Sequence, residues 1–298
     1  MVQGSLARVK RRFTRFVGID LGGGRGKTTA VAELRLPGNA QEESCVEVAR
    51  FATRSGRRPW TDDTLADALL DPDAPHTTTV LAIDAPLTRS ACDRCEVPVC
   101  PGTEACVDPA VVWLRTEGRS LVRGVGAEAI GQRSGPRAER VASHTAQARL
   151  APYAHRATDV ILTYGRGLLP LSSLGGVHGA IAARATQLRR RLRGACYELH
   201  ENLLEVSPSA TVAALAGPRA ARGYKRDADP WRTRALILER LGDLTFAPSS
   251  RMAREDVLQN DHCFEAVIGA YTAYLWARDG WTVPDGCFGE DGWIVVPP

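Results

Sequence analysis

Three carboxylates stand at the ends of apolar segments that read as buried strands. Asp20, Asp84 and Glu205 each come directly after a short run of apolar residues. Taking an unpaired carboxylate out of water costs several kcal/mol, so acidic residues are rare in protein interiors. A turn or cap role could explain any one of them, but three at equivalent strand positions call for a shared explanation.

That explanation is a metal centre. In open α/β sheets the carboxyl ends of the strands meet at one crevice, where ligands bind. Clustered carboxylates repel one another, and a divalent cation relieves the repulsion; hard oxygen ligands suit Mg²⁺ or Mn²⁺. Asp261 and Glu265 are four residues apart on a predicted helix, so they share one face and either can supply a further ligand.

A second group of residues with metal-binding spacing is rich in cysteine. Four of the eight cysteines lie within fifteen residues, in the pattern Cys92-x2-Cys95-x4-Cys100-x5-Cys106. A cytoplasmic chain does not need disulfides, and this density is typical of metal ligands. The spacing is close to that of a zinc knuckle with cysteine in place of histidine. Zinc is our first candidate, an iron–sulfur cluster is the alternative, and unligated or redox-active thiols are the third.

The segment after Asp20 contains the letters GKT at Gly26-Lys27-Thr28, which raises the question of a nucleotide-binding P-loop. A P-loop needs an earlier glycine at the position that Leu21 occupies, and it must be followed by a helix. Thr28–Leu36 instead has the β-branched, alternating pattern of a strand. We therefore predict a tight glycine hairpin that lets backbone or phosphate approach Asp20.

The elements that must position these residues follow from the hydrophobic pattern. Strands are predicted at Phe16–Leu21, Thr28–Leu36, Val46–Phe51, Thr78–Ile83 and Leu203–Val206, with a short closing strand at Gly292–Val296. Helices are predicted at Thr61–Leu70, Val177–Leu192, Ser209–Leu215, Trp231–Leu241 and Asp256–Ala277. Three antiparallel strands followed by alternating strands and helices predict an α/β fold with a mixed sheet.

Composition describes a globular chain of 298 residues with 44% hydrophobic and 24% charged residues. We expect a basic tail over residues 1–15, one domain over residues 16–298, and a cysteine-containing insertion over residues 87–150. No apolar run reaches the length of a membrane span, and the start lacks the features of a secretory signal, so we expect a cytoplasmic protein without a membrane partner. The net charge is +4, and nearly all the cationic residues are arginine. This balance weakly favours nucleic acid as partner.

The order of the acidic motifs resembles the domain-of-unknown-function family 429, which consists of predicted nucleases with an RNase H-like fold. The motifs are Val17-Gly18-Ile19-Asp20-Leu21, Ile83-Asp84-Ala85-Pro86-Leu87, Glu205-Val206-Ser207-Pro208-Ser209-Ala210-Thr211 and Asp261…Glu265-Ala266. The resemblance extends to Tyr153–Asp159, Tyr224-Lys225-Arg226 and Gly292–Pro297. This chain departs from the family in having Glu265 where the helix usually offers aspartate, and in its glycine-rich first turn.

The resemblance implies an RNase H-like five-stranded mixed sheet, with the cysteine insertion after the fourth strand. It also implies hydrolysis of RNA or DNA phosphodiester bonds by two metal ions. In this mechanism Asp20 bridges both ions, Asp84 and Glu205 hold one, and Asp261 or Glu265 completes the other. Lys225 and Arg226 are candidate phosphate contacts, and a solvated loop is their alternative. Among the histidines we single out His262, beside Asp261, for testing.

Two other functions remain open from the sequence. Gly18–Gly24 with Lys27 and Thr28 also resembles the phosphate hairpin of actin-like sugar kinases and ATPases, which share the RNase H-like core. Such proteins need a second glycine-rich phosphate motif, and Gly175-Gly176 is the only pair this chain offers. The other possibility is a non-catalytic RNase H-like scaffold that binds nucleic acid or protein. Saturable ATP binding would identify the first function, and absence of metal-dependent turnover would favour the second.

Overall fold

The computed structural model describes residues 13–23, 28–37, 45–70, 75–124, 150–168, 179–246 and 251–298. The chain divides into two compact units. Unit 1 comprises Met1–Leu87, Ala180–Val283 and Ile294–Pro298, and unit 2 comprises Thr88–Gly179 and Pro284–Trp293. All the carboxylates of interest belong to unit 1, and the four clustered cysteines belong to unit 2. Most of the expected basic tail, residues 1–12, lies outside the described residues, as do residues 125–149 of the expected insertion.

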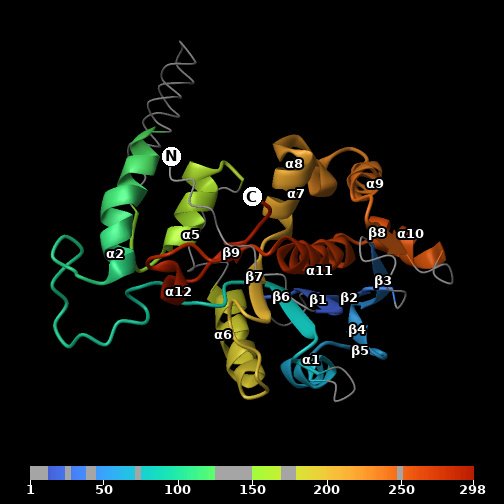
Figure 1. Ribbon diagram of the computed structural model, residues 1–298, viewed down its shortest axis with the longest axis horizontal. Coiled ribbons are helices and arrows are strands. Elements are labelled where there is room, and N and C mark those ends of the chain that lie inside the picture. The colour runs from blue at the N-terminus through green and yellow to red at the C-terminus, as the bar shows by residue number, and fades with distance from the viewer. Residues whose placement is uncertain are drawn as a thin grey trace, which may run out of the picture. The chain divides into compact units, whose positions relative to one another are not determined.

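Unit 1 is built on a mixed sheet of seven strands in the order β8-β3-β2-β1-β6-β7-β9 (Figure 1). Antiparallel pairs join β1 to β2 and β2 to β3, whereas β6 is parallel to both β1 and β7. The α/β class and the mixed sheet are thus as predicted. The strands are β1 (Arg15–Asp20), β2 (Ala30–Arg35), β3 (Val46–Ala52), β6 (Thr79–Asp84), β7 (Leu203–Val206), β8 (Leu244–Phe246) and β9 (Ile294–Val295).

The expectation of five strands is too low for the sheet as a whole. The predicted closing strand joins the sheet as β9, parallel to β7. Edge strand β8 pairs with β3 and was not predicted, because three residues are too few to show a strand period. A separate two-stranded ribbon, β4 (Arg54–Ser55) with β5 (Arg58–Pro59), extends from β3.

A strand follows the glycine segment, as predicted. Strands β1 and β2 form an antiparallel pair in which Asp20 lies opposite Ala30. The described ends of the connection are tied together, since the Gly22 N–H donates to the Thr29 hydroxyl over 3.0 Å. Residues 24–27 lie outside the described part. The order of elements is therefore not that of a P-loop, in which a helix must follow the glycines.

Helices cover both faces of the sheet in unit 1, with α11 on one face and α1 on the other (Figure 1). Residues of α1 and α6 pack in one core cluster with Val17 and Ile19 of β1. The helices of unit 1 are α1 (Asp62–Leu69), α6 (Gly179–Arg193), α7 (Pro208–Ala216), α8 (Pro218–Arg226), α9 (Pro230–Arg240), α10 (Arg251–Gln259) and α11 (Asp261–Asp279).

Helix α11 lies directly against β1 because one residue of that strand is glycine. A Cβ placed on Gly18 would lie 2.0 Å from the carbonyl oxygen of Ala266 and 2.4 Å from the amide nitrogen of Ala270. Side chains alternate along a strand, so Asp20 points to the same face as Gly18. The carboxylate of Asp20 thus emerges at the end of β1 on the side of α11.

The long helix predicted over Asp256–Ala277 is two helices, α10 and α11, separated at Asn260. Asn260 has extended backbone angles (φ −111°, ψ 113°), and its side chain accepts hydrogen bonds from the amides of His262 and Cys263. Asparagine is a preferred N-cap residue because it satisfies amides that have no partner within the helix. The break starts a new helix at Asp261 and places His262 in its first turn.

Unit 2 contains short helical segments around a buried carboxylate. They are α2 (Pro109–Trp113) continued by η1 (Leu114–Gly118), α5 (Ala157–Val160) continued by η2 (Ile161–Gly165), and α12 (Phe288–Asp291). Asp291 is fully buried and accepts hydrogen bonds from the Ala157 amide (2.6 Å) and the Arg94 guanidinium (3.4 Å). In the described part of the chain, no helix combines the length and apolar character needed to cross a membrane.

Candidate functional site

Asp20 and two residues of α11 form the centre of the site. Ligand atoms of Asp20, His262 and Glu265 all lie within 4.8 Å of one another, and no other such group of three occurs among the described residues. His262 Nδ1 is 2.6 Å from Asp20 Oδ2. This contact raises the pKa of His262, with burial acting against it. The side chains of Asp20 and His262 are 13% and 40% exposed, so solvent and ligands can reach this edge of the cluster.

Two residues of α8 contact the carboxylate of Glu265. Its Oε1 accepts a hydrogen bond from the Tyr224 hydroxyl and lies 2.7 Å from Lys225 Nζ. Burial and then the charge of Asp20 raise the pKa of Glu265, whereas Lys225 opposes the shift. Burial alone would lower the pKa of Lys225, but attraction to the nearby carboxylates, Glu265 first, outweighs it and the pKa is raised. Lys225 thus lies on a helix, beside the carboxylates.

Asp84 joins the same centre from the neighbouring strand. It is the direct register partner of Asp20 between the parallel strands β6 and β1, and it is half-buried. Its pKa is raised well above the usual range, first by burial and then by the negative charges of Glu265 and Asp20. A carboxyl group whose ionisation is opposed by two neighbouring carboxylates is a group that a cation would stabilise.

The side chain of Glu205 points to the other face of the sheet from Asp20 and Asp84. Its register partner is Ile83, which packs in the cluster with α1 and α6, so Glu205 points to the face opposite Asp84. The next residue of β7, Val206, is the one that faces α11, where it lies beside Gly269. Glu205 is buried, and its Oε2 accepts a hydrogen bond from the Leu87 amide over 2.8 Å. It thus fixes the chain just after Asp84, and its charge is the last of those that raise the pKa of Asp84.

Asp261 and Arg226 are also outside the cluster. Asp261 occupies the first turn of α11 and is not among the residues whose ligand atoms meet at Asp20. Between the two alternatives on this helix, the structure brings Glu265 and not Asp261 to Asp20. Arg226 is exposed at the end of α8. The helical spacing of Asp261 and Glu265 is as predicted, but Asp261 stands at the start of α11, whereas Glu265 is one turn further along the helix and buried.

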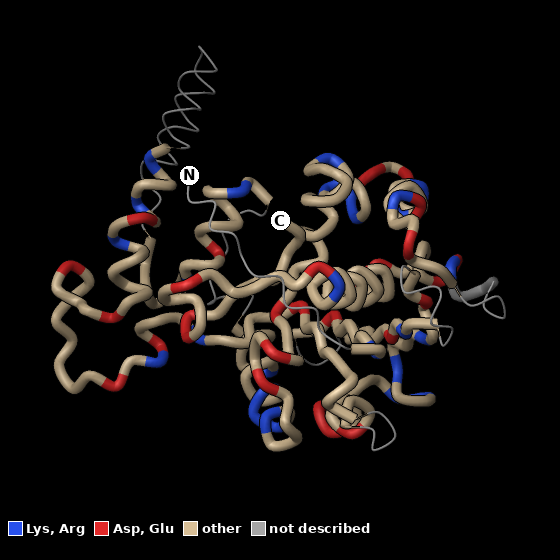
Figure 2. The backbone as a smooth tube through the Cα atoms, viewed as in Figure 1, with Lys and Arg blue, Asp and Glu red and all other residues tan. Residues whose placement is uncertain are grey.

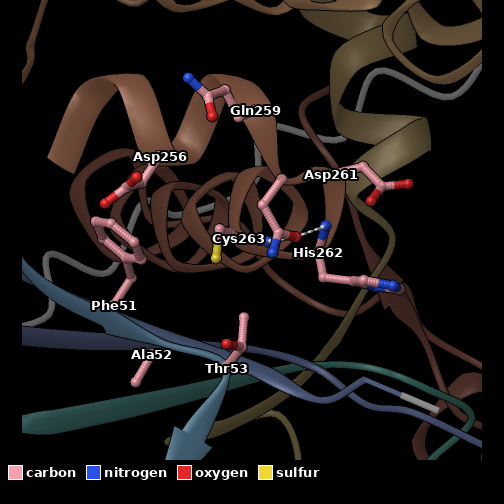
Figure 3. Close-up of a pocket in the computed structure, with 9 residues that line it drawn as sticks. Phe51, Ala52, Thr53, Asp256, Gln259, Asp261, His262 and Cys263 are labelled. Carbon is pink, nitrogen blue, oxygen red and sulfur yellow. Dashed lines mark hydrogen bonds between the residues drawn. The ribbon is translucent and has the colours of Figure 1, made fainter. Parts of the chain in front are cut away.

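An open pocket of about 690 Å³ adjoins His262 (Figure 3). Its floor is the end of β3, from which Phe51 and Thr53 rise toward the α10–α11 junction. The lining residues are Phe51, Ala52, Thr53, Asp256, Gln259, Asn260, Asp261, His262 and Cys263. The half-buried ring of Phe51 lines the same pocket as His262 and offers a ligand an aromatic surface.

Basic residues lie along both α6 and α8 (Figure 2), and the arginines of the two helices differ in what they contact. Arg184 of α6 pairs with Asp62 of α1 and donates to the Gly22 carbonyl (2.6 Å) and the Thr29 hydroxyl (2.8 Å), so it braces the glycine hairpin. On α8, by contrast, three exposed arginines spaced three and four residues apart form a stripe on one helix face, which we call the α8 stripe: Arg219, Arg222 and Arg226. The sequence analysis named Arg226 as a candidate phosphate contact and Tyr224 only as part of a motif, and it gave no role to Arg184, Arg219 or Arg222.

The four clustered cysteines are free thiols in unit 2. Cys92, Cys95 and Cys100 are exposed and Cys106 is half-buried. The four sulfur atoms do not supply a group of three within 4.8 Å. Metal binding by these residues therefore stays a prediction.

Comparisons of the chain with protein-family models, with curated proteins and with solved structures gave no match. Function must therefore be inferred from the chemistry of the site. That site offers Asp20 and Asp84 at the carboxyl ends of two parallel strands, and His262 and Glu265 from α11, a donor set that suits a divalent cation with a preference for oxygen ligands.

Proposed function

We propose that this protein is a metal-dependent nuclease that hydrolyses phosphodiester bonds of nucleic acid, with an RNase H-like core. The observation that carries the proposal is the convergence of Asp20, Asp84 and Glu265 from three separate elements, β1, β6 and α11. The antiparallel strands β1–β3, continued by the parallel strands β6 and β7, support the RNase H-like part of the proposal.

Asp20, Asp84, Glu265 and His262 are the residues that would hold Mg²⁺ or Mn²⁺. The raised pKa of Asp84 fits an ion here, since burial and then the charges of Glu265 and Asp20 oppose its ionisation, and a bound cation would favour the ionised form. In the two-metal mechanism, bound ions lower the pKa of an attacking water and stabilise the leaving oxygen. Asp20 is the proposed shared ligand because Asp84 and the α11 pair approach it from different elements.

The protein's own residues have separate tasks in this proposal. Tyr224 and Lys225 keep Glu265 oriented, and Glu205 fixes the backbone that follows Asp84. The α8 stripe provides exposed guanidinium groups, which bind phosphate oxygens through two parallel hydrogen bonds. Phe51 offers a surface on which an unpaired base can stack. Together these groups would orient a nucleic-acid strand toward Asp20.

The deciding experiment incubates the protein with labelled single-stranded, duplex, hybrid and branched nucleic acids in Mg²⁺ or Mn²⁺. We expect cleavage that a chelator abolishes, and loss of at least 100-fold in rate in Asp20→Asn and Asp84→Asn. The matched control is Glu205→Gln, which removes a carboxylate from the opposite face but retains an acceptor for the Leu87 amide. It should keep most of the activity.

Two results would contradict the assignment of the centre, and a third would contradict the nuclease function. Cleavage that persists in Asp84→Asn would show that the activity does not belong to this centre. Loss of cleavage in Glu205→Gln with an intact fold would return Glu205 to the ligand set, against its placement on the opposite face. If no substrate is cleaved while ATP binds saturably, the actin-like alternative gains the support instead.

A further inference from the structure

The cysteine segment of unit 2, residues 92–107, has an unusual physical character. No residue in this segment is buried, and none lies in a helix or strand. Three of its valines are 59%, 80% and 88% exposed: Val97, Val99 and Val107. Fixing the backbone of each residue costs about 1–2 kcal/mol, which globular chains recover by burying apolar side chains. This segment has no such burial, so its order requires another source of free energy.

Ionic contacts fix the two ends of the segment next to each other. Arg94 lies 3.3 Å from Asp108, whose carboxylate also caps α2. The Cys92 amide donates to the Pro152 carbonyl over 3.1 Å, which anchors the first end to the body of unit 2. The chain from Arg94 to Asp108 is thus closed into a loop, with Cys95 just inside one end and Cys106 just inside the other.

The second half of the loop is shaped around its cysteines. Gly102, with φ +82°, makes a turn in which its amide lies 3.4 Å from Cys100 Sγ and its carbonyl accepts from the Cys106 amide. Arg115 of η1 donates to the carbonyl oxygens of Thr103 (2.8 Å) and Cys106 (3.2 Å). An amide directed at a cysteine sulfur stabilises the thiolate, which is the form that binds metal.

The four thiols are available as ligands. All of them are free, and Cys92, Cys95 and Cys100 are exposed. A divalent cation with a preference for sulfur binds such thiols as thiolates.

We propose that Cys92, Cys95, Cys100 and Cys106 bind one Zn²⁺ in a structural site that holds the loop closed. The ion draws the sulfurs together from their present separation, and each thiol releases its proton to solvent as it becomes a ligand. The resulting site carries net negative charge, which the guanidinium of Arg115, bound to the Cys106 carbonyl, partly offsets. The site is separate from the carboxylate centre, which favours harder ions through its oxygen donors.

The test measures metal content and does not depend on nuclease activity. The full chain, purified without added metal and desalted, should contain about one zinc per chain by mass spectrometry. The double variant Cys95→Ser/Cys100→Ser should contain none. Cys196→Ser, which removes an exposed cysteine of unit 1, is the matched control and should retain the zinc, as should Asp84→Asn.

A second measurement needs no variant. Replacing zinc with Co²⁺ in the wild type should give the intense visible bands of tetrahedral cobalt–thiolate coordination, and adding Zn²⁺ should bleach them. Iron with inorganic sulfide in equal amounts, or no metal and no cobalt bands, would overturn the proposal. Zinc that survives the cysteine double variant but disappears in His262→Asn would also overturn it, since the ion would then belong to the carboxylate centre.

Discussion

The contact between β1 and α11 can be tested with two glycine substitutions that face each other. In Gly18→Ala the new Cβ would lie 2.0 Å from the Ala266 carbonyl oxygen. Both close neighbours are helix backbone, which cannot rotate aside, so α11 would have to move by about 1.4 Å to reach the ordinary contact distance of 3.4 Å. Overpacking of this kind costs about 1–3 kcal/mol, and the rigid neighbours place Gly18→Ala at or above the upper end.

Gly269→Ala is the matched control on the opposite side of the same contact. Its Cβ would find Val206 at 3.6 Å and the Gly18 Cα at 3.8 Å, which are ordinary van der Waals distances. Alanine also favours the helix over glycine by about 1 kcal/mol. This variant should therefore be as stable as the wild type or more stable.

Denaturant unfolding, followed by far-ultraviolet circular dichroism in chelator, measures both effects. We expect the transition midpoint to fall for Gly18→Ala and to stay or rise for Gly269→Ala, with a difference of about 4 kcal/mol in the free energy of unfolding. Since the shift of α11 also moves Glu265 away from Asp20, metal-dependent cleavage should fall in folded Gly18→Ala. Equal stability of the two variants would refute the packing argument and the placement of Asp20 beneath α11.

Three further predictions concern charged residues. Glu33 is buried with Arg15. Burial acts to raise the pKa of Glu33, but its arginine partners outweigh burial and the pKa is lowered. The ionised Glu33 therefore stabilises the fold above about pH 4.5, and this stabilisation is lost as the pH falls through the lowered pKa. Glu33→Gln should cost about 3 kcal/mol at pH 7 and flatten the acid limb of a denaturation curve. Asp291→Ala should destabilise unit 2 by about 3–5 kcal/mol because Arg94 and the Ala157 amide lose a buried partner; amide exchange of that unit measures it. Arg222→Ala should reduce the salt dependence of nucleic-acid binding by about one unit of slope, and an unchanged slope would remove α8 from the interface.

The local pattern was sufficient for the strands that end in Asp20 and Asp84. Each carboxylate closes an apolar run, and the parallel pairing of β1 with β6 puts the two in register. The face of the sheet to which Glu205 points could not be predicted from the local pattern. Which residue of β7 aligns with Asp84 depends on strand register, and a shift of one residue turns the side chain to the opposite face.

Two helix starts are marked by capping or proline residues, but the hydrophobic pattern alone did not reveal them. Asn260 is a strong N-cap type, but the apolar pattern continues across it, so α10 and α11 read as one helix. Pro218, directly after Gly217, marks the start of α8, because proline suits the first position of a helix. These boundaries matter to the site, since the first brings His262 to Asp20 and the second brings Lys225 to Glu265. Neither contact follows from spacing along the chain.

The charges of the centre decide how it can meet a phosphate. Three carboxylates, Asp20, Asp84 and Glu265, face two basic side chains, His262 and Lys225. When all three carboxylates are ionised, the centre remains negative even with both basic groups protonated, and it repels a phosphodiester. In the proposed function, a divalent cation reverses this local charge, while the α8 stripe attracts the flanking phosphates. The proposal therefore predicts that cleavage depends on metal, and cleavage that persists in excess chelator would contradict it.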